Sequence, residues 1–179
     1  MLYPIHSSLS RRRSASALFL VILSSITIAS FFSSCSGKNK YDHLVKKYLV
    51  PYSPSADLDV TSIPTPSWAL GIEKYKQGEY KDMEAAFNQL KPGNAYYYKA
   101  HYVMGIVALQ QHQPFKAIDE FKAVRANPES KYFKDAQWMT ALAYLEAGIP
   151  ARAKDILNAI LNSEKHHYKK QAKALLNEL

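Results

Sequence analysis

Histidine and cysteine are residue types whose side chains can bind a metal ion or act as a nucleophile. The chain has 179 residues, with six histidines and one cysteine. His166 and His167 are adjacent, so their rings would point apart on a helix, and no cluster of cysteines or carboxylates completes a metal site. His101 and His112 stand alone among tyrosines and glutamines. Because the sequence also lacks a glycine-rich phosphate loop and a nucleophile motif, we expect no enzyme activity, metal, cofactor or small-molecule substrate.

The cysteine, Cys35, directly follows a segment that has the layout of an export signal. Three arginines at residues 11–13 precede an apolar run over residues 17–32, and two serines close it. The run is shorter than the ~20 apolar residues of a comfortable membrane span, so a signal peptide over residues 1–34 fits better than a transmembrane helix. A lone cysteine in an exported chain forms no internal disulfide and needs another explanation.

The segment Phe32-Ser33-Ser34-Cys35 resembles the lipobox of bacterial lipoproteins, with phenylalanine where leucine is usual. The resemblance implies that Cys35 is lipidated and becomes the mature N-terminus, which anchors the chain to a membrane. Ser36 replaces the aspartate that retains lipoproteins at the inner membrane, which implies an outer-membrane protein facing the periplasm. Two alternatives stay open. In the first, Cys35 is a free thiol that follows an ordinary signal peptide. In the second, the signal is not cleaved and spans the inner membrane.

The chain is basic, with a formal net charge of +8, and its lysines are densest in residues 165–173. Such a cluster can attract acidic lipid head groups or anionic partners, or it can be the solvated face of a helix. Export would remove the chain from nucleic acids, so we expect no nucleic-acid partner.

Four kinds of residue recur at intervals of 34 and then 36 positions. An aromatic residue is followed by a small residue, then by a residue that is alanine in two of the three copies, then by a large apolar anchor. The three sets are Trp68, Gly71, Met83 and Phe87; Tyr102, Gly105, Ala117 and Phe121; and Trp138, Ala141, Ala153 and Leu157. A period near 34 is typical of stacked helix-turn-helix units, and the small residues allow two helices to cross closely.

Prolines and glycines predict the ends of the helices that carry these residues. The expected helices cover residues 66–77, 80–90, 95–111, 114–126, 131–147, 150–161 and 165–179. Residues 67–162 thus hold three helix pairs, at 67–94, 95–128 and 131–162, and residues 163–179 form a capping helix. The longer second interval falls in the turn at residues 127–131, where neither helix of a pair loses its register.

These pairs resemble the tetratricopeptide (TPR) repeat. The matching residues are Leu70-Gly71 and residues 76–80, then Ala117-Ile118 with Phe121, then Tyr144, Gly148 and Ala153. The departures are Lys74 for an aromatic residue, Pro114 and Pro150 for tyrosine, and His112 for the turn glycine. The resemblance implies an all-α fold, a right-handed helical-repeat solenoid of three TPR-like helix pairs plus a C-terminal capping helix. It also implies a protein-binding groove lined by the first helix of each pair.

Residues 35–66 are expected to form a lipid-anchor tether and a proline-rich linker. Tyr41, Leu44, Val45, Tyr48 and Leu49 recur at helical spacing and predict two helical turns. Four prolines between residues 51 and 66 prevent a long helix after them. A stiff spacer that lifts the helical domain off the membrane is the natural interpretation.

A second apolar stripe follows the first helix of each pair, with members at i, i+4 and i+7. The members are Trp68, Ile72 and Tyr75; Tyr102, Ile106 and Leu109; and Trp138, Leu142 and Leu145. A large exposed apolar patch marks an interaction site, and Trp and Tyr are frequent interface anchors. We therefore predict that these nine residues bind a protein partner. The alternative is that the stripe is covered within the chain, by residues 41–52 or by curvature of the stack.

The patterns together predict a membrane-anchored TPR scaffold or adaptor that docks another cell-envelope protein through this stripe. Two other interpretations stay open. The chain is a single-span inner-membrane TPR protein in envelope signalling or stress regulation, or it is a structural protein that self-associates through the stripe.

Overall fold

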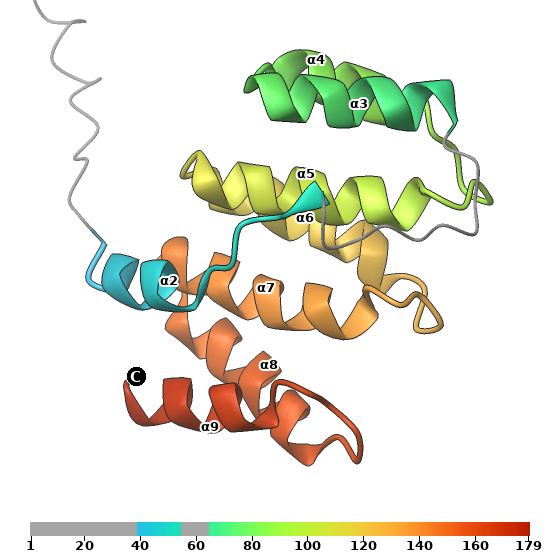
Figure 1. The fold of residues 1–179 in the computed structure, drawn as a ribbon. Helices are drawn as coiled ribbons and strands as arrows, with labels where there is room; N and C mark the ends of the chain where they lie inside the picture. Colours follow the sequence, from blue (N-terminus) through green and yellow to red (C-terminus); the bar gives the residue numbers. More distant parts are fainter. Residues whose placement is uncertain (1–38, 55–64) are drawn as a thin grey trace, which may run out of the picture. The chain divides into compact units, whose positions relative to one another are not determined.

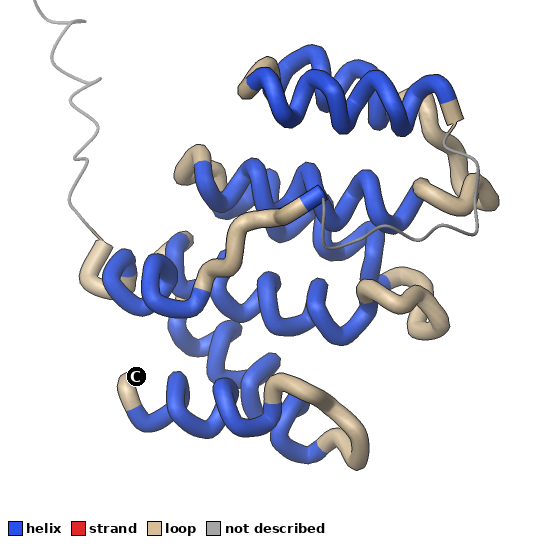
Figure 2. Tube along the Cα trace, in the orientation of Figure 1, coloured by secondary structure: helices blue, strands red, loops and turns tan. Residues whose placement is uncertain are grey.

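The computed structural model describes residues 39–54 and 65–179, which form helices joined by short connections (Figure 1). The helices are α2 (Asp42–Tyr48), α3 (Pro66–Gln77), α4 (Tyr80–Phe87), α5 (Tyr97–Gln110), α6 (Pro114–Arg125), α7 (Phe133–Glu146), α8 (Pro150–Asn162) and α9 (Lys169–Asn177). These two ranges contain no strand (Figure 2), which confirms the all-α class for the described residues. None of the described helices is both long enough and apolar enough to span a bilayer. The predicted signal, Cys35 and residues 55–64 of the linker lie outside the described ranges.

Several helix ends lie where proline, threonine and glycine predicted them. Thr65 caps α3, because its Oγ1 accepts a hydrogen bond from the Trp68 backbone N–H at 3.4 Å, and Pro66 is the first helical residue. Gly78 ends α3 with a φ of 75°. His112, at the turn where the TPR pattern has glycine, also adopts a left-handed conformation, with a φ of 56°.

Three predicted helix starts were too early, because a turn with its own side-chain hydrogen bond precedes α5, α7 and α9. In each turn a tyrosine N–H donates to a side chain two residues before it. The pairs are Tyr96 to Asn94 Oδ1 at 2.9 Å, Tyr132 to Ser130 Oγ at 3.3 Å and Tyr168 to His166 Nδ1 at 3.2 Å. The same turn precedes α2, where Tyr41 N–H donates to Asn39 Oδ1 at 3.0 Å. These local bonds compete with the helix and delay its first residue. One helix end also differs from the prediction, because α4 stops at Phe87 and the sequence predicted an end at residue 90.

The turn before α9 contains a buried histidine, His166, that predicts a dependence of stability on pH. His166 Nδ1 accepts from Tyr168 N–H, and Nε2 faces Gln137 Oε1 at 3.2 Å, so the hydrogen bonds assign a neutral ring with its proton on Nε2. Burial, followed by the neighbouring charges of His167 and Lys134, lowers the pKa of His166. Protonation would remove the acceptor that holds the start of α9.

We therefore expect the free energy of unfolding to fall as the pH drops below ~6.5, the pKa of an unfolded histidine, because the unfolded chain then binds the proton more readily. The His166→Asn variant keeps an acceptor of the kind found at residues 39 and 94, and it should lose this part of the pH dependence. Thermal unfolding of both chains at pH 8 and pH 5.5 measures the difference. An equal fall in melting temperature for both chains would contradict the role of His166.

The helices pack on their neighbours in the chain: α3 with α4, α5 with α6, α6 with α7, α7 with α8, and α9 with α8, whereas α4 and α5 contact each other less. Gly71 on α3 faces Phe87, and Gly105 on α5 faces Phe121, so closely that a β-carbon added to either glycine would overlap the ring. The prediction that small residues occupy the crossings is therefore confirmed for these two pairs. The arrangement is a helical repeat-like fold.

Two of the helices, α5 and α7, are buried on nearly all sides. Val103, Met104 and Val107 of α5 join a cluster with α3 and α4, whereas Ile106 and Leu109 join a second cluster with α2 and α6–α9. A helix that is apolar all round belongs in a core. A second apolar stripe on α5 and α7 can therefore belong to the core instead of the surface.

Candidate partner-binding face

An aromatic stack joins each helix pair to the next element. The stacked rings are Trp68 on Tyr96 (4.9 Å, 15°), Tyr102 on Tyr132 (5.3 Å, 24°) and Trp138 on Tyr168 (5.0 Å, 5°). Each tyrosine is the residue directly before a helix, so the turn hydrogen bonds position the second ring of every stack. The first aromatic residue of each stripe segment thus packs between pairs. The constant interval of 36 from Tyr96 to Tyr132 to Tyr168 was a sequence signal for these stacks that we missed.

Burial differs among the nine predicted stripe residues. Six are buried, namely Trp68, Ile106, Leu109, Trp138, Leu142 and Leu145. Trp68 is 6% exposed and lies between the rings of Phe87 and Tyr96, with Lys99 Nζ 4.9 Å from its ring centre. The other three, Ile72, Tyr75 and Tyr102, are half-buried. The role of the nine residues in partner binding stays a prediction, but only these last three offer accessible surface here.

Residues 39–54, which we call the strap, lie across the first helices of the pairs. Its helix α2 packs on α7, with Tyr41, Leu44 and Val45 buried. The ring of Tyr48 meets Trp138 edge-on at 5.7 Å. Farther along, the Tyr52 ring meets the Tyr75 ring at 5.7 Å. The sequence left open whether the stripe is exposed or covered within the chain. In the structure the strap covers part of the stripe, so residues 39–54 of the predicted tether are docked on the helices.

Polar contacts hold the strap at both ends. Asn39 Nδ2 donates to the carbonyls of Leu145 and Glu146 at 2.8 and 2.6 Å, which satisfies the carboxyl end of α7. Lys47 Nζ and the Tyr48 hydroxyl donate to the Glu178 carboxylate at 2.9 and 2.7 Å. The Tyr75 hydroxyl donates to the Tyr52 carbonyl at 2.8 Å, and this bond fixes the extended end of the strap.

Replacing Leu44 by aspartate should undock the strap without unfolding the helix pairs. Leu44 is 1% exposed, and an ionised carboxylate buried there without a partner costs several kcal/mol, whereas the strap can leave as a unit. We expect near-native helix content by circular dichroism, a red shift of tryptophan emission as Trp138 becomes hydrated, and increased binding of a hydrophobic dye. His43→Asp, at an exposed neighbouring position, is the matched control and should change none of these. Cooperative loss of all helix in Leu44→Asp would show that the strap is an inseparable part of the core.

Beside the strap lies a groove of about 530 Å³ that remains open among the described residues. Tyr102 and Ile106, two of the predicted residues, lie in its wall. The remaining lining residues are Val50, Pro51, Tyr52, Ser53, Lys131, Tyr132, Asp135, Met139 and Tyr168. The sequence analysis did not predict these, because the strap and the turn before α7 meet α5 only in the folded chain.

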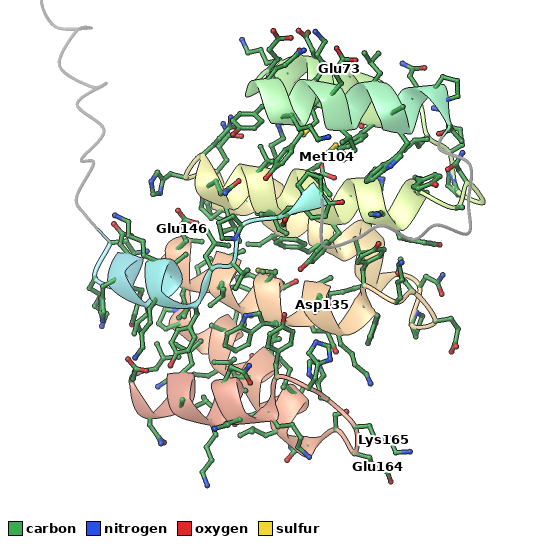
Figure 3. All side chains as sticks on the ribbon, in the orientation of Figure 1. Glu73, Met104, Asp135, Glu146, Glu164 and Lys165 are labelled. Carbon is green, nitrogen blue, oxygen red and sulfur yellow. The ribbon has the colours of Figure 1, made fainter. Side chains whose placement is uncertain are left out.

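The groove has aromatic walls and a polar end. Burial, followed by the charge of Asp135 and a hydrogen bond with it, raises the pKa of the Tyr168 hydroxyl. Asp135, labelled in Figure 3 on α7, is also 3.0 Å from His167 Nε2. Apolar walls with a few fixed donors and acceptors are typical of binding pockets in general.

His101 and His112 were predicted to stand alone, but each lies beside a glutamate. His101 Nδ1 is 2.7 Å from Glu120 Oε2, and His112 Nδ1 is 2.7 Å from Glu146 Oε1. His166 and His167 lie in the turn before α9 rather than in a helix, with ring centres 5.5 Å apart. Among the described residues, no group of three or more His, Cys, Asp and Glu side chains could hold a metal ion.

We found no family model, no curated protein and no solved structure that matches the chain. Its function is therefore inferred from its own geometry.

Proposed function

We propose that this protein is a membrane-anchored helical-repeat adaptor that docks another cell-envelope protein on the face formed by α3, α5 and α7. The finer architecture in this proposal is a right-handed solenoid of three TPR-like pairs with α9 as its cap. The anchor is a lipid on Cys35, which holds the helical domain at the periplasmic side of the outer membrane.

The observation that carries this proposal is that the face already holds a polypeptide segment, which is the strap. Tyr48 and Tyr52 bring their rings onto Trp138 and Tyr75, and the Tyr52 carbonyl accepts a hydrogen bond from the face. A main-chain hydrogen bond combined with side-chain contacts is how extended peptides are bound in general. The adjacent groove, with Tyr102 in its wall, offers the same kind of surface to a segment of another protein.

In-cell photo-crosslinking tests the docking function. A photoreactive amino acid at position 102 lies in the groove, and one at position 115 is the matched control, because Phe115 is 63% exposed on α6. We expect position 102 to capture one envelope protein, identified by mass spectrometry, and position 115 not to capture it. Lys131→Glu and Asp135→Asn, at the polar end of the groove, should reduce the capture. Crosslinks from position 102 only to the chain itself would contradict an adaptor.

The anchor is tested separately by the intact mass of the membrane-bound protein. A lipoprotein lacks residues 1–34 and carries the added mass of acyl chains, and both changes should disappear in Cys35→Ser. A full-length chain of unmodified mass would instead support the single-span inner-membrane alternative.

A further inference from the structure

A smaller cavity of about 170 Å³ lies between the strap and the carboxyl ends of α5 and α7. Its lining residues are Asp42, Val45, Lys46 and Leu49 of the strap, Leu109 and Gln110 of α5, His112 in the following turn, and Glu146 at the end of α7. One water molecule occupies ~30 Å³ in the liquid, so the cavity has room for several heavy atoms. It is distinct from the groove beside Tyr102, with which it shares none of its lining residues.

The cavity contains a buried carboxylate with an unused acceptor. The Glu146 side chain is 6% exposed, and its Oε1 is 2.7 Å from His112 Nδ1. Its Oε2 is buried and makes no hydrogen bond with any group in residues 39–54 and 65–179. Figure 3 labels Glu146 at the end of α7 that lies beside α2. Buried polar atoms are nearly always paired, so an orphaned carboxylate oxygen at a cavity wall indicates a missing donor.

The surroundings of Oε2 favour a cationic donor over a neutral one. Both α5 and α7 end here, and the carboxyl ends of helices carry partial negative charge. Burial raises the pKa of the Glu146 carboxyl, the hydrogen bond and charge of His112 lower it, and the charge of Asp42 adds a smaller upward shift. Lys46 and His112 are the basic groups of the lining, and both are exposed to solvent. The inner end of the cavity therefore favours a positively charged ligand, although the whole chain carries a net charge of +8.

We propose that this cavity binds the side chain of an arginine or lysine residue from the partner protein, with the Glu146 carboxylate as its counter-ion. Val45, Leu49 and Leu109 would surround the aliphatic stem, and the charged head would supply the hydrogen bond that Oε2 lacks. Only the source of the side chain rests on the proposed adaptor function. The cation site itself rests on the cavity.

The first test uses n-propylguanidinium chloride as the probe and n-propylurea as its neutral counterpart. Both are titrated into the isotope-labelled full-length chain and followed by NMR. We expect saturable shifts from propylguanidinium at Val45, Leu109 and His112, with a fall in the Glu146 carboxyl pKa, and none of these from propylurea. Equal shifts from both probes would show an apolar cavity without charge selectivity and would overturn the proposal. Non-saturating shifts spread over the surface would also overturn it.

The second test removes the charge without changing the shape. Glu146→Gln should weaken propylguanidinium binding by about tenfold or more, because a charged hydrogen bond is lost. Asp42→Asn, at a half-buried lining position, is the matched control and should weaken it by about threefold or less, since a charge that is partly open to solvent is screened more than the buried Oε2. Equal effects of the two substitutions would contradict the role of Glu146. The comparison of the two probes in the unmodified chain still decides the proposal if Glu146→Gln does not fold.

A last comparison identifies the source of the side chain. The capped tripeptide acetyl-Ala-Arg-Ala-amide should bind at least as tightly as free arginine, because the proposal needs only the side chain. Tighter binding of free arginine by about tenfold would mark a small-molecule site and overturn the assignment to a protein partner. Crosslinking from position 102 does not depend on Glu146 binding any small probe, so failure of the cavity and failure of the adaptor function are distinguishable.

Discussion

Replacing Trp138 by alanine is expected to destabilise the protein by about 3–5 kcal/mol, the range for removing a buried aromatic side chain. Trp138 is 1% exposed. It stacks on Tyr168 at 5.0 Å and meets Tyr48 edge-on at 5.7 Å, so one side chain joins α7 to the turn before α9 and to the strap. Urea denaturation followed by circular dichroism measures the change in the free energy of unfolding.

Phe115→Ala is the matched control for this substitution. Phe115 is 63% exposed, and its truncation should change stability by less than about 0.5 kcal/mol. If Trp138→Ala lowers the free energy of unfolding by less than about 1 kcal/mol, Trp138 is a surface residue that is open to a binding partner.

Gly105→Ala should destabilise the protein by about 1–3 kcal/mol, although alanine favours a helix by ~1 kcal/mol over glycine. The added β-carbon would overlap the ring of Phe121, which is fully buried, so the ring or the helices must shift within the packed core. The packing loss therefore exceeds the gain in helix propensity. Chemical denaturation of the variant gives the sign directly.

The third helix pair supplies the compensating change. There the repeat has Ala141 and Leu157 at the positions of Gly105 and Phe121, and both are fully buried. The double variant with Gly105→Ala and Phe121→Leu should therefore lose less stability than the two single variants together. We expect its free energy of unfolding to exceed the additive value by about 1 kcal/mol or more. Effects that add to within about 0.5 kcal/mol would show that the glycine and the ring do not share one space.

The parts of the fold that the sequence predicted are those encoded locally. Pro66, Pro114 and Pro150 begin helices because their fixed φ suits the first turn, and Gly78 and Gly148 end helices because they tolerate positive φ. The spacing predicted a close helix crossing at Gly71, but not that the ring of Phe87 from the same pair would lie against it. Helix starts were less accurate, because the side-chain bonds of Asn94, Ser130 and His166 compete with the helix over two to four residues.

The parts that the sequence left open depend on contacts between distant segments. The spacing of Tyr41, Leu44 and Val45 predicts an amphipathic helix, but it does not say against which element that helix packs. An i, i+4, i+7 stripe is the same pattern whether water, a partner or the strap covers it, so Trp138 could be placed only by the fold. The groove beside Tyr102 combines the strap with α5 and α7, and no local pattern encodes that combination.

Hydrogen exchange reports whether the strap is docked on the face of α3, α5 and α7. A seven-residue helix has negligible stability alone in water, so protection of α2 requires its packing on α7. We predict that the amides of Val45 and Leu49, bonded to the carbonyls of Tyr41 and Val45, exchange at least about 100-fold more slowly than in an unfolded peptide. Exchange at the unfolded rate would contradict the account, because the strap would then be a free tether and the stripe it covers would be open to solvent.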